Sequence, residues 1–399
     1  MAQTPASVDT IFHVLRELPE TTRTDLVART GLSKATVSET IAQLLANGLV
    51  TEVGKREPGR GRRQVLLRLR TDSRLVIGAE FNEHGCRAVL ADLRAGPVTF
   101  AERTFTSTDP DDFVVALESC VSELRTHARA PVLGIGIGVP GLVDDAGRVA
   151  LISVPFGWRD VPIAEMVERR TGLPATIANR AKAAALGEYW QGSSGDLSAR
   201  SHLAYITVGA GIVAGFVIDG EPYYGHVGTA GELGHTTVEP DGPLCGCGNN
   251  GCLHMMASES AIIRHVRESH ATMPDHVRAS HPPLEIHDGL TIDDLSLALR
   301  DGHPLVVQAI ERAARYLGIA LGNLINIVNP SHVVIGGSVA AFGEVLLVPL
   351  RAELQRRALW DARRRLSIDT SRLGEDVGPI GGAALCLSRV DSARMIHPD

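Results

Sequence analysis

The sequence contains no long hydrophobic run. None of its segments reaches the roughly 18 uninterrupted apolar residues that a membrane-spanning helix needs. The N-terminus also lacks the basic stretch followed by an apolar stretch that marks a secretory signal. We therefore expect no membrane partner and a cytoplasmic location.

Cysteine is scarce, and half of it lies in one place. The 399-residue chain has six cysteines, of which three fall in the stretch CGCGNNGCLH at 245–254. In a reducing compartment, clustered cysteines are more often metal ligands or catalytic groups than disulfides. The remaining composition, 44% hydrophobic and 21% charged, is typical of a globular protein with about two to three domains.

The sequence lacks an excess of basic residues, apart from a net positive charge over its first 70 residues. Residues 1–70 contain eleven Lys and Arg against seven Asp and Glu, a formal charge of +4. The whole chain has a net charge of −7, which leaves −11 for the remainder. This asymmetry predicts that only the first segment meets a polyanion.

Residues 8–46 have the pattern of a helix-turn-helix. Apolar residues recur at helical spacing over 8–18, a second short helix follows in TRTDLVART, and Gly31 precedes a third helix with Ser33 as its N-cap. A helix, a glycine-containing turn and a second helix are typical of DNA-binding proteins. Four side chains near the start of the third helix are suited to base edges and phosphates in a major groove: Ser33, Lys34, Thr36 and Ser38.

The following stretch, LVTEVGKREPGRGRRQVLLRLR, predicts a wing of two strands joined by a Pro- and Gly-containing loop. Arg60, Arg62 and Arg63 on this loop could enter a minor groove, where cationic side chains find enhanced negative potential. A solvated basic loop is the alternative interpretation. Because the loop is attached to a helix-turn-helix, we favour binding to double-stranded DNA.

From residue 74 onward, strands and glycine-rich turns alternate with amphipathic helices over 113–128, 181–191 and 305–323. This alternation predicts an α/β architecture with mainly buried sheets. Glycines at strand ends, as in HVVIGGSVA, permit close approach of a ligand, but such turns also simply connect strands.

Four stretches together resemble the ROK family, which groups sugar-responsive repressors with sugar kinases. They are the winged helix, GIGIGVPGLVD, GTAGELGHTTV and CGCGNNGCLHMMAS. The resemblance implies an N-terminal winged helix-turn-helix followed by a two-lobed actin/hexokinase-like ATPase fold, with sugar bound between the lobes. We expect the winged helix-turn-helix at 1–72, a small lobe at 73–184 with a C-terminal helix at 386–399, and a large lobe at 185–385.

The three clustered cysteines and one histidine form a Cys3His set, which is typical of structural zinc sites. The resemblance assigns the histidine to His235 of GELGH, which joins Cys245, Cys247 and Cys252. His254 is the competing fourth ligand because it lies two residues after Cys252. In related kinases the metal-bound histidine also contacts the sugar, so zinc would link metal occupancy to effector binding.

Two features of the family's kinases are missing. Where the kinases carry a catalytic Asp, this chain has Arg180, and a guanidinium cannot accept a proton at physiological pH. Where they carry an Asp-Gly-Gly-Thr run, this chain has GAEFNEHGCRA, with Glu80 at the Asp position and Asn82 and Glu83 in place of the glycines. We expect a sensor without kinase activity. The alternative is a sugar kinase fused to a DNA-binding head, with Glu80 or Asp144 as the base.

The sugar pocket implied by the resemblance is only partly kept. Asn179, Glu232 and His235 match its sugar-contacting positions, whereas His254 replaces a family Glu and Pro155 a family Asn. Arg180 adds a fixed cation, which favours an anionic effector such as a sugar phosphate. The alternative is that Arg180 pairs with a neighbouring carboxylate.

The partners that follow are a palindromic DNA operator, a sugar or sugar-phosphate effector, and a second copy of the chain in a homodimer or homotetramer. A winged helix that binds protein instead of DNA is a further alternative. The His-rich stretch 264–289 has irregular spacing, so we interpret it as a surface insertion and assign no ligands there.

Overall fold

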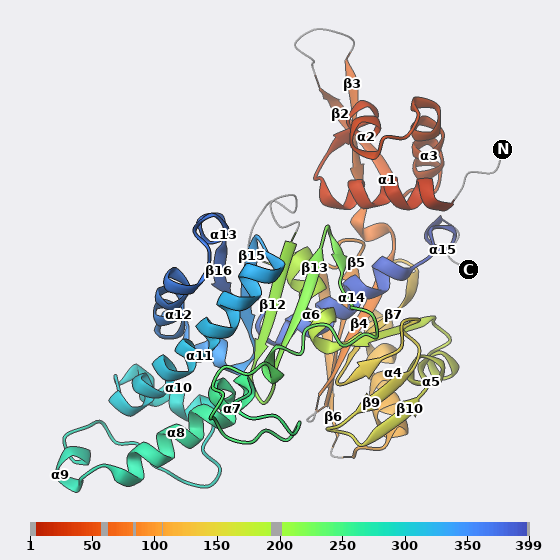
Figure 1. The fold of residues 1–399 in the computed structure, drawn as a ribbon. Coiled ribbons are helices and arrows are strands. Elements are labelled where there is room, and N and C mark those ends of the chain that lie inside the picture. Colours follow the sequence, from red (N-terminus) through yellow and green to blue (C-terminus); the bar gives the residue numbers. More distant parts are fainter. Residues whose placement is uncertain (1–4, 57–62, 83–84, 106, 193–201, 397–399) are drawn as a thin grey trace. The chain divides into compact units, whose positions relative to one another are not determined.

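The computed structural model describes residues 5–56, 63–82, 85–105, 107–192 and 202–396 (Figure 1). It divides into two compact units, residues 1–191 with 376–399 (unit 1) and residues 192–375 (unit 2). The expected boundary at residue 184 falls inside helix α6 (Arg180–Gln191), which unit 1 keeps whole. The last helices, α14 (Val377–Arg389) and α15 (Ser392–Ile396), also belong to unit 1.

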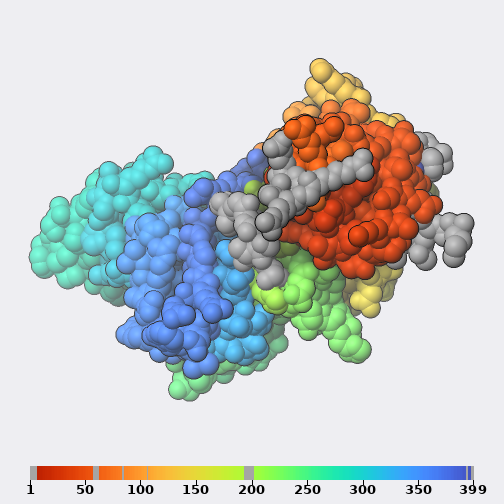
Figure 2. All heavy atoms as spheres, turned by 90° about the horizontal axis from the view of Figure 1, so that it is seen from above, coloured from red at the N-terminus to blue at the C-terminus, as the bar shows by residue number. Residues whose placement is uncertain are grey.

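The first 72 residues are called the head below, and their described part forms a winged helix. The atoms of the head are red to orange in Figure 2. Its three helices are α1 (Pro5–Glu17), α2 (Arg23–Thr30) and α3 (Lys34–Ala46), and its sheet has the order β1-β3-β2 with strands Thr21–Thr22, Gln64–Leu69 and Val50–Arg56. Phe12, Leu26 and Ile41, one from each helix, are fully or almost fully buried and form the core between the helices. The helix-turn-helix and wing predicted from the sequence are confirmed.

Local signals fix the ends of the helix-turn-helix. Thr22 and Asp25 form a reciprocal capping box at the start of α2. Gly31 ends α2 with φ of +70°, a conformation that favours glycine. Ser33 then caps α3 by accepting a hydrogen bond from the Thr36 N–H at 3.1 Å.

The body of unit 1 contains a five-stranded sheet in the order β11-β7-β4-β5-β6. Its strands are Ala175–Asn179, Val132–Val139, Leu75–Asn82, Gly85–Asp92 and Pro97–Thr104. Helices α4 (Pro110–His127) and α5 (Ile163–Thr171) share one apolar cluster with this sheet. Beside the sheet, β8 (Leu142–Val143), β9 (Ala150–Ser153) and β10 (Trp158–Val161) form a small antiparallel sheet.

Helix α14 packs against the same large sheet through glycine. A Cβ atom at Gly78 of β4 would overlap the Pro379 carbonyl oxygen of α14, and one at Gly136 of β7 would overlap the Gly382 carbonyl oxygen. Isoleucines one position away, Ile77 and Ile137, belong to the α4 and α5 cluster. Because successive strand residues face opposite sides of a sheet, one face carries the apolar core and the other admits α14 at close range.

Unit 2 repeats the strand order with a second five-stranded sheet, β14-β13-β12-β15-β16. Its strands are Glu221–Pro222, Ile212–Ile218, His202–Val208, His332–Gly336 and Ser367–Thr370. Its helices are α7 (Leu253–Ala257), α8 (Glu259–Thr272), α9 (Asp275–Arg278), α10 (Ile292–Arg300), α11 (Pro304–Val328), α12 (Glu344–Arg357) and α13 (Trp360–Arg364). Among the described residues, no helix is both long and apolar enough to cross a membrane.

Candidate functional site

Four side chains of unit 2 come together as a candidate metal centre. The ligand atoms of His235, Cys245, Cys247 and Cys252 all lie within 4.8 Å of one another. The Cys245 Sγ lies 3.7 Å from His235 Nδ1, and the Cys247 Sγ lies 3.6 Å from the Cys252 Sγ. These four donors could hold a metal ion.

Short elements and tight turns bring these donors together. His235 ends a 3-10 turn over Leu233–His235, and Cys252 is the residue before α7. The Cys245 N–H donates to the Asn249 carbonyl at 2.8 Å, which closes the turn that carries Cys247. Gly251 has φ of +61°, and a Cβ atom there would overlap the Glu239 carbonyl oxygen. Only glycine therefore fits the position that leads the chain back to Cys252.

The thiols of the cluster differ in acidity. A backbone hydrogen bond from Asn249, aided by the neighbouring thiols and His235, lowers the pKa of Cys247 to about 7. Burial, together with the neighbouring thiols, raises the pKa of Cys252 to about 12. One thiolate therefore forms easily in this cluster, whereas a second and third would crowd negative charge, and a bound cation removes that penalty.

His254, the competing fourth ligand, lies outside the cluster of four. Its ring centroid is 6.4 Å from that of His235. Burial and the nearby His235 lower the pKa of His254, so its imidazole is neutral at neutral pH. Glu232 is exposed and immediately precedes the turn that carries His235. Three of the predicted effector residues, Glu232, His235 and His254, therefore lie in unit 2, at or next to the candidate metal centre.

The other two predicted effector residues lie in unit 1. Asn179 ends β11, and Arg180 begins α6. The Asn179 side chain is already used at both ends: Nδ2 donates to the Gly141 carbonyl at 2.8 Å, and Oδ1 accepts from the Ala181 N–H at 2.9 Å. Asn179 therefore fixes the start of α6 and the turn at Gly141, a structural role that the sequence did not reveal.

Glu80 lies at the N-terminus of α14. A Cβ atom at Gly378, in the first turn of that helix, would overlap the Glu80 carboxylate. Helix N-termini attract anions, so this carboxylate occupies a place that would otherwise suit a phosphate. The neighbouring Asn82 Oδ1 accepts from the Gly85 N–H at 3.0 Å and closes the hairpin. Glu83 lies outside the described residues.

Asp144, the other residue considered as a base, has a structural task. Its Oδ1 accepts hydrogen bonds from the Arg148 N–H at 2.6 Å and the Val149 N–H at 2.8 Å. These bonds hold the turn between β8 and β9, so Oδ1 already accepts two backbone hydrogen bonds.

The predicted DNA-contacting side chains are at or near the start of α3. Ser33, Lys34 and Ser38 are exposed, and Thr36 is half-buried. The Ser33 Oγ also lies 2.9 Å from the Thr36 Oγ1, so the two hydroxyls share one small network. On the wing, Arg63 is exposed next to β3, whereas Arg60 and Arg62 lie outside the described residues.

Contacts between the head and the body of unit 1 were not predicted. The Arg16 guanidinium of α1 lies 4.7 Å from the centroid of the Trp190 ring of α6, and its Nη1 donates to the Leu387 carbonyl of α14 at 3.2 Å. From the body, Arg94 Nη2 donates to the carbonyls of Leu15 (3.3 Å) and Leu18. No spacing rule connects residues so far apart in the sequence, so only the structure could reveal these contacts.

Comparison with known proteins adds independent information. Residues 84–389 match the ROK family, and residues 4–63 match the MarR family. A protein of Caldicellulosiruptor sp. (strain Rt8B.4), named a putative xylose repressor, is 34% identical over 373 residues, which cover 92% of this chain and 91% of that protein.

The solved structures that resemble this chain include a regulator and a kinase. A ROK family transcriptional regulator, a homolog of the E. coli MLC protein, has a TM-score of 0.81 at 26% identity and covers 96% of both chains. A ROK family glucokinase from Streptomyces griseus, in complex with glucose and AMPPNP, has a TM-score of 0.66 at 30% identity and covers 78% of this chain and 98% of its own. The regulator thus matches a larger share of this chain than the kinase does.

Proposed function

This chain belongs to the ROK family, and on that premise we propose that it is a sugar-responsive transcriptional repressor whose winged helix binds DNA. The observation that carries the proposal is the serine-capped helix α3, with exposed Ser33, Lys34 and Ser38 at its start, on a head of net positive charge. Relatives that cover nine-tenths of the chain are named xylose repressors, which supports a sugar as the effector.

We infer that the body senses its ligand without phosphorylating it. Arg180 stands at the position of the catalytic base, Asp144 is held in a turn, and the Glu80 carboxylate occupies the N-terminus of α14. Phosphoryl transfer needs a group that positions the attacking hydroxyl and a cradle for the triphosphate. Neither is provided by these three residues.

Selection of bound duplexes from a random-sequence DNA pool tests the proposed function. Intact protein should recover one inverted repeat at near-physiological salt, because a symmetric dimer or tetramer reads two half-sites. The recovered duplex then serves as the probe for release by sugars. Recovery of no sequence above background would contradict the repressor proposal and favour a kinase with a head that does not read DNA.

We propose zinc as the metal of the Cys3His cluster. In tetrahedral zinc sites, Zn–S bonds of about 2.3 Å place two sulfurs about 3.8 Å apart, and a sulfur and a nitrogen about 3.6 Å apart. The corresponding distances here, 3.6 Å between Cys247 and Cys252 and 3.7 Å between Cys245 and His235, are close to these values. Bound zinc would hold the glycine-rich loop and orient His235, with no open position for catalysis.

We propose that the effector carries negative charge and contacts Arg180. A guanidinium keeps its charge at every physiological pH and binds phosphates and carboxylates with charge-assisted hydrogen bonds. Titration calorimetry of the intact protein with a sugar and with its 6-phosphate should therefore give tighter binding of the phosphate, and Arg180→Met should remove the difference. Equal or absent heats would contradict an anionic effector.

Helix α6 offers a route from this effector residue to the head. It begins at Arg180 and ends beside Trp190, whose ring lies under the Arg16 guanidinium. Gly187 of α6 packs so closely on α14 that a Cβ atom would lie 2.8 Å from the Gly381 amide nitrogen. A displacement at the start of α6 would therefore also shift Trp190 and the Arg16 side chain of α1 that contacts it, because the closely packed helix pair moves as a unit.

Substitution of the head contacts tests this route. In the double variant Arg16→Met/Arg94→Met, we expect DNA affinity within about threefold of the unchanged protein but at least about a tenfold change in the effector concentration that releases DNA, since coupling free energies are typically 1–3 kcal/mol. Fluorescence anisotropy of labelled operator, titrated with effector, measures both quantities. Arg29→Met is the matched control, because Arg29 pairs with Glu17 inside the head. An unchanged effector response would refute the route.

A further inference from the structure

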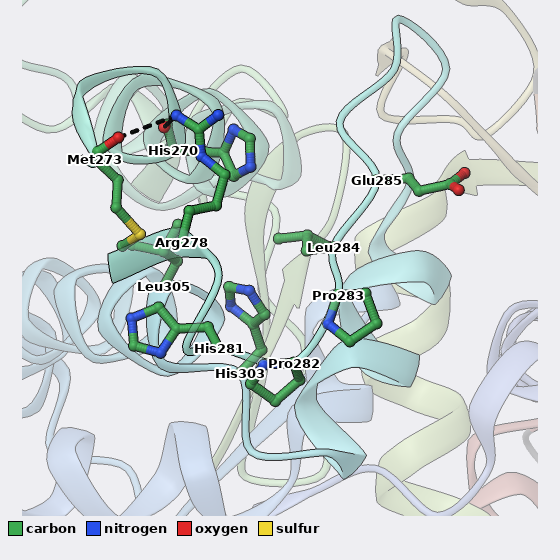
Figure 3. A pocket seen from close by; sticks show the side chains of 10 residues that line it. All are labelled: His270, Met273, Arg278, His281, Pro282, Pro283, Leu284, Glu285, His303 and Leu305. Atoms are coloured by element: carbon green, nitrogen blue, oxygen red, sulfur yellow. Dashed lines mark hydrogen bonds between the residues drawn. The ribbon is translucent and has the colours of Figure 1, made fainter. Parts of the chain in front are cut away.

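Unit 2 contains a cavity of about 210 Å³ between the end of α8, helix α9, the following loop and the start of α11 (Figure 3). Its polar wall includes His270, Arg278, His281 and His303, and Leu284 and Leu305 belong to its apolar wall. Two of these histidines come from the irregular His-rich stretch, and the third lies outside it. The sequence therefore gave no sign that they face one space.

His303 is the buried polar group of this cavity. Its side chain is almost entirely enclosed, at 3% exposure, and its Nδ1 is buried without a hydrogen-bond partner. Figure 3 shows the ring next to that of His281, and the two ring centroids are 6.0 Å apart. Buried polar atoms are nearly always hydrogen-bonded, so this nitrogen is available to a partner from a ligand.

Positive potential surrounds the same nitrogen. His303 is the N-cap residue of α11, a helix of 25 residues, and its ring makes no capping bond. The N–H of Leu305, in the first turn, has no acceptor within the helix, and the helix dipole adds partial positive charge there. The Arg278 guanidinium is held by the His270 and Met273 carbonyls at 3.2 and 3.0 Å, and its charge is offset by Asp275, whose Oδ1 lies 3.5 Å from its Nη1, so the positive potential comes chiefly from the helix.

The carboxylate that lines the cavity points away from its histidines. Glu285 is the acidic residue that lines the cavity, and Figure 3 shows its side chain pointing away from the histidines. Burial, followed by the charges of His281 and His270, lowers the pKa of His303, so its ring is neutral at neutral pH and can donate one N–H. The space is therefore polar and supplied with donors, and of the two nearby carboxylates Glu285 points away and Asp275 is paired with Arg278.

A metal ion does not suit this arrangement. Among the residues that the structure describes, the His235 and cysteine cluster is the one group of three or more metal-binding side chains with ligand atoms within 4.8 Å of one another. The imidazoles of the cavity do not converge in this way, and the partial positive charge at the α11 N-terminus would repel a cation. An anion meets the opposite conditions.

We propose that this cavity binds a small organic anion, with its acidic group on His281, His303 and the N-terminus of α11 and its apolar body against Leu284 and Leu305. Its volume is below the about 300–1,000 Å³ of sites for drug-sized ligands, so it suits a molecule with a single ring or a short chain. All contacting residues belong to unit 2, and the inference does not depend on DNA binding or on the sugar effector.

Benzoate and benzyl alcohol form a matched pair of probes, since they share the ring and differ in charge. Calorimetry with the intact protein should detect benzoate and show benzyl alcohol at least about tenfold weaker, because hydrogen bonds to a charged group are worth about 1.5–3 kcal/mol. Hydrogen exchange should slow on benzoate addition within 270–285 and 303–308. Equal binding of the two probes, or protection confined to other segments, overturns the proposal.

Variants give a second test that does not depend on the choice of ring. His281→Ala should weaken benzoate at least about tenfold, and inorganic phosphate should compete with benzoate at the same site. His276→Ala is the control: it removes an exposed imidazole of α9 that is not among the residues lining the cavity. Equal effects of the two variants, or no binding of either benzoate or phosphate at about 10 mM, refute an anion site.

Discussion

The variant Cys247→Ser is expected to lose its metal. Cys247 is the exposed thiol of the Cys3His cluster, and its neighbours Cys245 and Cys252 are buried, so the change removes a ligand with little effect on packing. Loss of outer-shell partners alone typically lowers metal affinity 10–100-fold, so loss of a direct ligand should lower it by at least about 100-fold. Elemental analysis after dialysis should find about one zinc per chain in the unchanged protein and almost none in the variant.

The same variant should be less stable, since a metal that binds only the folded state stabilises it by mass action. Thermal unfolding with and without a chelator should show a lower midpoint for Cys247→Ser and no further effect of chelation on that variant. Cys247→His is the matched control, because imidazole is also a zinc ligand and should restore part of the metal content. Full metal content in Cys247→Ser would show that the four side chains are not its ligands.

The triple variant Arg60→Gln/Arg62→Gln/Arg63→Gln is expected to bind operator DNA about 100-fold more weakly at physiological salt. Each lost phosphate contact lowers the slope of log K against log salt by about 0.9, so the slope should fall by up to about 2.7. Anisotropy titrations at several salt concentrations measure both changes. The fold of the head should persist, because Arg63 is exposed and the described core of the head is built from apolar residues such as Phe12, Leu26 and Ile41.

A control must separate contacts in the wing from the change in total charge. Three exposed arginines outside the head, changed together to glutamine, remove the same number of positive charges. They are Arg129 of unit 1 and Arg300 and Arg315 of unit 2. We expect this control to leave affinity within about threefold and the salt slope unchanged, since screening limits charges more than about 10 Å from the DNA. Equal losses in the two triple variants would show that the wing makes no specific contribution.

The sequence predicted those parts of the molecule that depend on local pattern. Apolar spacing and the Ser33 cap predicted α3, since a helix start is encoded within a few residues. The clustered cysteines predicted a metal site from local pattern, and the family resemblance supplied His235 as its fourth member. The alternation of strands and helices predicted the α/β architecture, and the family resemblance indicated that Arg180 stands where the kinases carry a catalytic Asp.

What remained hidden depends on contacts between distant residues. Arg16 meets the Leu387 carbonyl from the other end of the chain, and no local signal connects them. The sequence marked Asn179 as a sugar contact but could not show that Gly141 and Ala181 already use its side chain. His281 and His303 share a cavity only because the chain folds back before α11 begins.

The close packing of α14 against the first sheet also has a consequence for biosynthesis. Gly78 and Gly136 precede unit 2 in the chain, yet the helix that covers them is synthesised only after unit 2. Unit 2 is one continuous segment and can fold while unit 1 still lacks its closing helix. Translation that stops before residue 377 would therefore release a chain with an uncovered sheet in unit 1, a state prone to aggregation and degradation. Premature termination just before α14 should consequently be as damaging as termination within unit 2.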